Sequence, residues 1–322
     1  MTSVARRLGR VVTLNESRPS AEPSATEALS EVLSGRHLAV AYQPIVARVP
    51  AGDHEHWAID AIEALVRARA NNGCVLRPDR LLPAVARAGL MQPLFTFVFA
   101  ESLNAWCTLR AGGIRVALSV NLHAEALQDD DLPRTILSLL ELTGIAPERF
   151  TIELTESGPI SDLHRASRNL WRLRRHRVRV ALDDFGSRFS TQTRLDCLEA
   201  DEVKIDKALV FGLEQNEEQR RIVEHIVQLA HVRGMTVVAE GVETRSCLDL
   251  LGSMGVDRAQ GFLIGRPQFE SQLPVLLRRW GSGEACDVAN DHAQLSLPGL
   301  EVPRATGGAR DIQSAPRGPR GL

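Results

Sequence analysis

The stretch Val178-Arg179-Val180-Ala181-Leu182-Asp183-Asp184-Phe185-Gly186 has the pattern of a short apolar strand that ends in two adjacent carboxylates and a glycine. Apolar runs bounded by turn residues are typical of strands that are buried on both faces. Because neighbouring side chains of a strand point to opposite faces, Asp183 and Asp184 can converge only where the strand stops and the backbone turns. We expect Phe185-Gly186 to supply that turn. Taken alone, the tetrapeptide is more simply a solvated turn, so the interpretation depends on the rest of the chain.

Strands and helices alternate on both sides of this stretch. Strands separated by helices imply parallel pairing with right-handed crossovers. Eight such strands within about 250 residues predict a closed β/α barrel rather than an open sheet. The predicted strands are Ala39–Val46, Trp57–Arg67, Arg115–Asn121, Phe150–Leu154, the stretch that contains Asp183-Asp184, Glu202–Asp206, Thr236–Glu240 and Arg258–Ile264. The last predicted helix covers Phe269–Trp280.

The two ends of the chain differ from this pattern in composition. Residues 1–33 are polar, of mixed charge and rich in Ser, Pro and Glu, and residues 282–322 are rich in Gly, Pro, Ala and Arg. Segments with little apolar periodicity do not bury enough surface to fold. We therefore predict a flexible N-terminal arm over residues 1–33, a barrel domain over residues 34–281 and a disordered C-terminal tail over residues 282–322.

The composition excludes several classes of protein. A net charge of −2 provides no global basic field for a nucleic-acid polymer. No apolar run is long enough to span a bilayer. The five cysteines are scattered without CxxC spacing, which argues against a zinc site and against a disulfide framework. Reduced thiols in a cytoplasmic protein are the simplest expectation.

Polar residues recur at the ends of the predicted strands, where a barrel has its mouth. An unpartnered buried charge costs several kcal/mol, so the repetition makes sense if these groups meet at one mouth and share ions. Taken singly, each residue is more simply a solvated loop or strand-edge side chain, and the joint pattern carries the prediction. The residues are Glu63, Asn121, Glu153, Asp183, Lys204, Glu240 and Gln260.

The residue types point to metal-assisted chemistry. Glu63, Asn121, Glu153 and Asp183 are hard oxygen donors that suit Mg²⁺ or Mn²⁺, and the absence of His and Cys among them argues against zinc. A carboxylate next to the first site, that of Asp184, allows a second ion. Two such ions suit hydrolysis of a phosphodiester.

Three further side chains fit the same chemistry. Lys204 can orient the attacking water or neutralise developing phosphate charge, Glu240 can act as a base or a water ligand, and Arg67 can grip a phosphate.

The motifs together resemble a known family, the EAL domains, which are phosphodiesterases of the bacterial second messenger cyclic di-GMP. The resemblance extends from about His37 to Trp280. It rests on Tyr42-Gln43-Pro44-Ile45-Val46, Glu63-Ala64-Leu65 with Arg67, Val120-Asn121, Glu153-Leu154-Thr155-Glu156-Ser157, Asp183-Asp184-Phe185-Gly186, Val203-Lys204-Ile205-Asp206, Ala239-Glu240-Gly241-Val242-Glu243-Thr244 and Gln260-Gly261. It implies a TIM-like (β/α)8 barrel with an antiparallel first strand and a metal-dependent opening of cyclic di-GMP to linear pGpG.

The resemblance also implies roles by position. Glu63, Asn121, Glu153 and Asp183 would hold one ion, and Asp184 would hold a second ion together with Asp183. The catalytic set would be Lys204 and Glu240 at the nucleophilic water, Glu156 as anchor of the loop after Asp184, and Glu243. The ligand contacts would be Gln43, Arg67 and Gln260. Members of the family often dimerise through the barrel, so a homodimer is one expectation.

One departure from the family pattern leaves an alternative open. The loop after Gly186 usually continues Thr-Gly-Tyr-Ser, but here it is Ser187-Arg188-Phe189-Ser190. Glycine takes backbone angles that Arg188 takes less easily, and in the family this loop couples metal binding to dimerisation and activation. The alternative is a catalytically weak or inactive EAL-like module that binds cyclic di-GMP or a protein partner.

Overall fold

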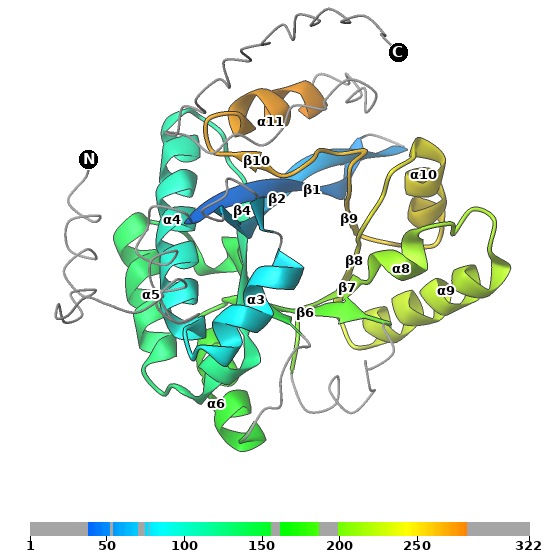
Figure 1. Ribbon diagram of the computed structural model, residues 1–322. Coiled ribbons are helices and arrows are strands. Elements are labelled where there is room, and N and C mark those ends of the chain that lie inside the picture. The colour runs from blue at the N-terminus through cyan, green and yellow to red at the C-terminus, as the bar shows by residue number, and fades with distance from the viewer. Residues whose placement is uncertain are drawn as a thin grey trace, which may run out of the picture. The chain divides into compact units, whose positions relative to one another are not determined.

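The computed structural model describes residues 38–51, 54–69, 75–76, 78–155, 162–186 and 199–281. The predicted arms, Glu156 and Arg188 lie outside these residues. Eight strands form the barrel, and it closes because the first of them pairs with both the second and the last (Figure 1). They are β1 (Leu38–Ala51), β2 (His54–Arg69), β4 (Ala117–His123), β5 (Phe150–Thr155), β6 (Arg179–Phe185), β7 (Glu202–Ile205), β8 (Thr236–Ala239) and β9 (Arg258–Gln260).

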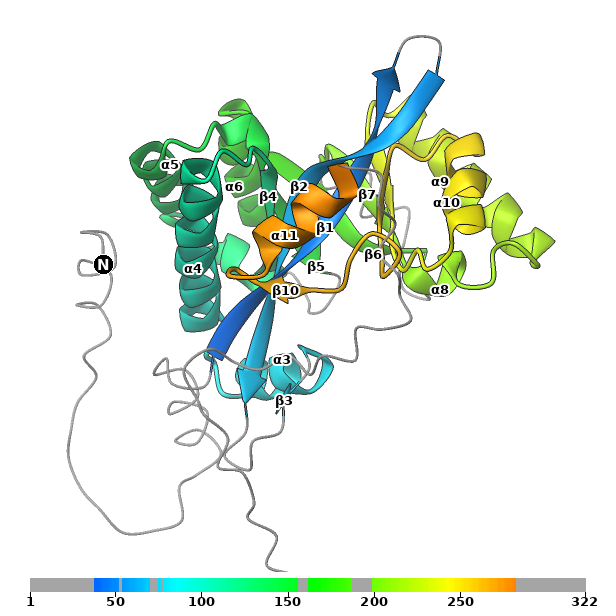
Figure 2. The same ribbon diagram turned by 90° about the horizontal axis from the view of Figure 1, so that it is seen from above.

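The first strand runs against all its neighbours. β1 is antiparallel to β2 and to β9, whereas each later neighbouring pair of the barrel, from β2–β4 to β8–β9, is parallel. A short hairpin joins β1 to β2, and such a connection forces antiparallel pairing, whereas the parallel pairs need longer crossovers. The hairpin projects past the barrel at the end where β1 stops (Figure 2). The predicted TIM-like barrel with an antiparallel first strand is confirmed.

Helices surround the barrel (Figure 1). Several begin at a side chain that accepts a hydrogen bond from the first turn: Asp162 caps α6, Asn216 caps α9 and Thr244 caps α10. None of the helices that the structure describes is both long and apolar enough to cross a membrane. The helices are α3 (Pro78–Arg87), α4 (Met91–Ala111), α5 (Leu132–Thr143), α6 (Leu163–Arg175), α8 (Lys207–Val210), α9 (Glu217–Val232), α10 (Arg245–Ser253) and α11 (Leu273–Gly281), with the short 3-10 turns η2 (Ala124–Gln128) and η3 (Pro147–Arg149).

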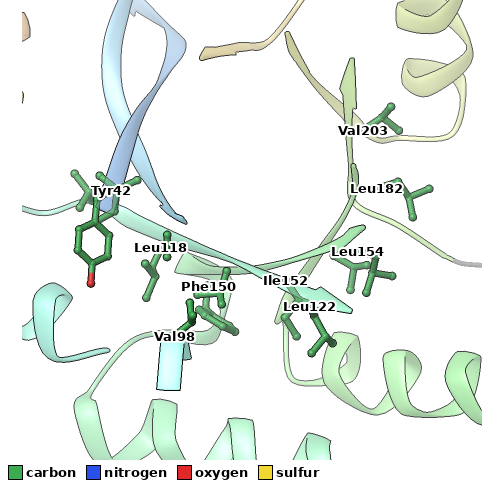
Figure 3. Packing of buried hydrophobic residues seen from close by; sticks show 14 of the residues in the cluster. Tyr42, Val98, Leu118, Leu122, Phe150, Ile152, Leu154, Leu182 and Val203 are labelled. Carbon is green, nitrogen blue, oxygen red and sulfur yellow. The ribbon is translucent and has the colours of Figure 1, made fainter. Parts of the chain in front are cut away.

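The alternation of side chains along each strand separates two cores. On β4 and β5, residues such as Leu118, Phe150 and Ile152 face outward and pack against the helices (Figure 3). Phe150 lies 5.4 Å from the ring of Phe99 on α4. Burying a side chain of this size stabilises the fold by roughly 1.5–3 kcal/mol. The opposite faces of the strands point into the barrel, where Ile45, Ala61, Ala117 and Val238 form a separate small cluster.

The amino ends of the parallel strands are closed by a buried ion network. Glu202 is fully buried. Its Oε2 atom accepts hydrogen bonds from Arg258 at 3.0 Å, Thr236 at 3.1 Å and Arg179 at 3.2 Å. Arg258 also pairs with Asp60. The network occupies this end of the barrel, so the opposite end, where the parallel strands stop, is the one that holds a site.

Two predicted elements near the C-terminus of the barrel are wrong in their bounds. The last strand ends at Gln260 rather than Ile264, because the backbone at Gly261 turns against the loop after β8; a Cβ there would lie 2.1 Å from the carbonyl oxygen of Val242. The last helix begins at Leu273 rather than Phe269. The residues before it form the short strand β10 (Gln268–Phe269), which pairs with β1. A second short strand, β3 (Val75–Leu76), pairs with β2.

Candidate active site

The carboxyl ends of the strands place the predicted polar residues at one mouth. The inward positions of β2, β4, β5 and β6 carry Glu63, Asn121, Glu153 and Asp183. Asn121 pairs with Glu153, whereas Glu63 pairs with Ser119, two residues before Asn121, and Glu153 pairs with Ala181, two residues before Asp183. Lys204 lies on β7, Glu240 directly follows β8, and Gln260 ends β9. The prediction that these side chains meet at one place is confirmed by the distances between them.

Lys204 is the centre of the mouth. Its Nζ atom lies 2.6 Å from Glu240 Oε1, 2.7 Å from Glu153 Oε2, 3.3 Å from Glu63 Oε2 and 3.4 Å from Asp183 Oδ1. Its side chain is 1% exposed. Burial disfavours a charged lysine, but the four carboxylates outweigh that effect and hold the pKa of Lys204 well above its usual range. The lysine is therefore charged and ties four strands together.

The mouth carries more negative charge than Lys204 can balance. Burial and mutual repulsion raise the pKa of Glu153 well above its usual range and also raise the pKa of Asp183. The same causes raise the pKa of Asp184 to about 6, and burial raises the pKa of Glu240 to about 8. Five carboxylates facing one ammonium group must take up protons or bind further cations.

Unlike the other four carboxylates, Glu63 has a lowered pKa, because hydrogen-bond donors surround it. Burial raises its pKa, but Lys204 and hydrogen bonds from Gln260 and Asn121 outweigh burial and hold the pKa below its ordinary value. Asn121 donates to Glu63 Oε1 at 2.7 Å, and Gln260 donates to Glu63 Oε2 at 2.7 Å. Glu63 is therefore an ionised carboxylate held in one orientation.

A relay of amides supports this orientation from behind. Gln260 Nε2 also donates to Gln43 Oε1 at 3.1 Å, and Gln43 Nε2 donates to the carbonyl of Gly265 at 3.0 Å. Gln43 and Gln260 are 9% and 4% exposed. Both were predicted as ligand contacts, and the structure places them where they orient Glu63.

The two adjacent aspartates converge through a left-handed backbone. Asp184 has a φ of 55°, and the pairing of β6 with β7 shifts register between Leu182 and Phe185. The predicted turn is present at Gly186, which has a φ of 92°, but the sequence did not predict the further left-handed residue at Asp184. A left-handed conformation costs a residue other than glycine roughly 1–2 kcal/mol. In this arrangement Asp183, Asp184 and Glu240 each offer an oxygen within 4.8 Å of the others.

The residues present suit a hard divalent cation. Among the described residues, Glu153 Oε1 is buried and accepts no hydrogen bond, and Asp183 Oδ1 is buried with the ammonium group of Lys204 3.4 Å away. Buried carboxylate oxygens without donors are costly, and they are the ligands that Mg²⁺ and Mn²⁺ prefer. The cluster of Asp183, Asp184 and Glu240 adds oxygen atoms at the solvent side of the same mouth. The donor set is therefore one that could hold a cation.

Two predicted residues stand apart from the central cluster. Arg67 lies on β2 four residues beyond Glu63 and is half-buried; its Nη1 atom donates to the carbonyl of Val66 at 2.9 Å. Glu243 is exposed in the loop after β8. Glu156 lies outside the described residues.

Asp206 lies near the site and was not predicted as a site residue. Asp206 caps α8 through a 2.6 Å hydrogen bond from Ala208 and contributes to the raised pKa of Asp184. A signal was present, because Asp206 lies two residues after Lys204 and so has the same facing on an extended strand.

A β/α barrel with five carboxylates grouped around a buried lysine at its mouth defines a class of acidic barrel sites whose oxygen donors could hold a cation. The chain belongs to the EAL domain family: the model of this family matches residues 26–267.

Curated relatives and a solved structure agree with this assignment. The probable cyclic di-GMP phosphodiesterase PdeA of Escherichia coli (strain K12) is 34% identical over 207 residues, which cover 64% of this chain and 28% of PdeA. The cyclic di-GMP phosphodiesterase PdeF of the same organism is 30% identical over 240 residues, which cover 74% of this chain and 31% of PdeF. The PaMucR phosphodiesterase in its c-di-GMP complex is 30% identical with a TM-score of 0.68, and the match covers 77% of this chain and 99% of that one.

The matched region is one part of longer proteins. The chain spans about a third of the length of the curated relatives it matches first. The similarity therefore concerns the barrel domain.

Proposed function

We propose that this chain is a phosphodiesterase that opens cyclic di-GMP to linear pGpG with the help of two Mg²⁺ or Mn²⁺ ions. The observation that carries the proposal is a buried group of carboxylate oxygens beside an ionised Glu63: Glu153 Oε1 has no donor, and Asp183 Oδ1 lies 3.4 Å from Lys204 Nζ. The similarity to PaMucR, whose complex contains c-di-GMP, supports this substrate class.

The proposed ion ligands are assigned by position from the EAL family, and the convergence of their side chains at the mouth supports the assignment. Glu63, Asn121, Glu153 and Asp183 would hold one ion, and Asp184 with Asp183 would hold the other. When bound, the ions supply a water of lowered pKa and neutralise charge on the phosphate. Gln260 and Asn121 keep the carboxylate of Glu63 in place through their 2.7 Å hydrogen bonds.

Glu240 acts on the proton of the attacking water, and Lys204 positions Glu240. The 2.6 Å contact of Lys204 Nζ with Glu240 Oε1 fixes this carboxylate at the edge of the mouth, where its side chain is 20% exposed. Burial raises the pKa of Glu240 to about 8, which favours its protonated form at neutral pH; the positive charge of bound ions would favour the carboxylate form, which accepts the proton. Lys204, which stays charged, opposes the negative charge that develops on the phosphate.

The remaining predicted residues would serve the ligand and the loops. Arg67 would contact a phosphate of cyclic di-GMP through its guanidinium group. Gln43 and Gln260 would contact the ligand from the Glu63 side. Glu156 and Glu243 would hold the loops next to the mouth.

The test is hydrolysis of cyclic di-GMP by the full chain with Mg²⁺, with Mn²⁺ and with chelator, with pGpG resolved by chromatography. We expect metal-dependent product and a loss of at least a hundredfold in Glu63→Gln, which keeps the size of the side chain but removes its charge. The matched control is Glu217→Gln on the exposed start of α9, which is expected to retain full activity. Equal product from Glu63→Gln and the unaltered chain would overturn the proposal.

A second candidate function is a binding module with little or no turnover. The observation in its favour is Arg188 at a place where the family usually has glycine. Saturable binding of cyclic di-GMP without pGpG in either metal would select this function. Recovery of turnover in Arg188→Gly would show instead an enzyme slowed by its loop.

A further inference from the structure

The outer side of the barrel carries a groove between two helices. It has a volume of about 740 Å³ and is lined by α5, α6 and the segment that leads into β5. Its apolar lining includes Pro133, Leu137 and Ile145, and Trp171 borders it from α6. The lining runs from the start of α5 at Pro133 to Ile145 before β5, so the groove lies along the outer side of the barrel, whereas the mouth opens at the carboxyl ends of the strands. A molecule bound here would not enter the site described above.

Trp171 is an exposed anchor within this groove. Its side chain is 50% exposed, and the guanidinium of Arg175 stacks on its ring at 4.8 Å. Tryptophan and arginine are the residues that most often dominate the binding energy of protein interfaces. A half-exposed tryptophan beside a hollow gives a partner a large apolar area to cover.

The charge of the groove is strongly one-sided. Between Asp162 and Arg179 the chain has seven arginines and one aspartate, although its net charge is −2. Several of these arginines are neutralised: Arg168 pairs with Asp130, and Arg174 with Asp201.

Two of the three arginines that line the groove are not neutralised in this way, whereas the third, Arg134, pairs with Asp131. Arg172 donates to the backbone carbonyl of Asp130 at 2.8 Å and to the amide oxygen of Asn169 at 3.3 Å. Among the described residues, neither Arg172 nor Arg175 has a carboxylate at ion-pair distance. Glu141 is the acidic residue of the lining, so the groove has an excess of positive charge.

We propose that this groove binds an acidic peptide segment of a partner protein, with an apolar side chain inserted beside Trp171 and carboxylates paired with Arg172 and Arg175. A concave surface between two helices suits a helix or an extended segment, whereas a flat anionic membrane would reach only its rims. Bidentate pairing of guanidinium with carboxylate gives the contact its direction. This inference does not depend on the proposed hydrolysis, because the groove is lined by the outer helices α5 and α6 and by none of the residues of the mouth.

The binding experiment uses a fluorescein-labelled peptide of about 15 residues, with leucines at helical spacing among glutamates, titrated with the full chain and followed by anisotropy. We expect saturable binding that weakens at high salt. Trp171→Ala and the double variant Arg172→Glu/Arg175→Glu should each weaken binding at least tenfold, and Trp171→Phe should retain most of it. Arg221→Glu, an equally exposed arginine on α9, is the matched control and should bind as the unaltered chain does.

The outcomes that would overturn the proposal are distinct. Equal binding by the double variant would show that the peptide does not bind in the groove. Equal binding of a peptide with glutamine in place of glutamate would show that its carboxylates are not recognised. Groove-dependent binding of phosphatidylserine vesicles or of a single-stranded DNA oligonucleotide, without binding of the peptide, would assign the surface to another class of partner. A dimer in sedimentation that Trp171→Ala dissociates would assign it to a second copy of this chain.

Discussion

Replacing Lys204 by methionine is expected to lower the free energy of unfolding by about 3–5 kcal/mol when a chelator is present. Methionine keeps the length and the apolar stem of the side chain but removes the charge that contacts Glu63, Glu153, Asp183 and Glu240. Removing one partner of a buried ion pair leaves uncompensated charge, and here one ammonium group serves four carboxylates. The upper part of the range is therefore the better expectation.

The magnitude converts into a shift that a thermal melt can resolve. For a domain of this size, each kcal/mol moves the melting temperature by about 2–4 °C, so a shift of about 6–20 °C is expected. Circular dichroism at 222 nm in chelator measures it. Arg221→Met is the control, because Arg221 pairs with Glu217 on an exposed helix surface and such pairs contribute about 1 kcal/mol or less.

Metal provides the second half of this test. If Lys204 balances the charge of metal ligands, Mn²⁺ should raise the melting temperature of Lys204→Met more than that of the unaltered chain, because cations take over part of the role of the ammonium group. A variant that melts like the unaltered chain in chelator would refute the assignment of Lys204 as the centre of charge balance. A variant that is destabilised equally with and without Mn²⁺ would refute the link to metal binding.

Three further predictions concern single features of the site and fold. In chelator, the melting temperature should fall as pH rises from about 5 to 8. Glu240 has a folded-state pKa of about 8, above its unfolded value of about 4.3, so the folded state binds more protons than the unfolded state in this window. A melting temperature that rises across this window without metal would contradict the raised pKa. Gln260→Leu should lower turnover about 10- to 100-fold, because Glu63 loses a hydrogen-bond donor at 2.7 Å. Steady-state kinetics measure the loss. An unchanged kcat/KM would mean that Glu63 does not need the hydrogen bond from Gln260. Gly261→Ala should prevent accumulation of folded protein, because the added Cβ would lie 2.1 Å from a backbone atom. In the control Gly234→Ala, the added Cβ meets nothing within 4 Å, and the free energy of unfolding should fall by only about 1–2 kcal/mol. Soluble yield and urea denaturation compare the two variants.

The alternation of strands and helices was sufficient to predict the barrel, and the polar residues at strand ends were sufficient to predict its mouth. Both signals are local, since strand length, apolar character and the position of a charge at a strand end can be read along the chain. Glu153 and Lys204 illustrate this, because a charge within an apolar strand makes physical sense only with partners from other strands. The bounds at Gly261 and Leu273 were missed because they depend on contacts with the loop after β8 and with β1, which are distant in the sequence.

The chain's own order of residues thus contained the fold class, the strand ends and the chemical types of the site. The pairing within the mouth came from the folded chain: closure of the barrel brings Gln260 to Glu63, which is 197 positions away, and Lys204 to Glu63, which is 141 positions away. It also made Gln43 a support of Gln260 and gave Asp184 itself a left-handed backbone before the predicted turn at Gly186. The physical reason is that periodicity records which face of a strand a side chain occupies, whereas hydrogen-bond partners and charge balance depend on which strands the closed sheet places opposite one another.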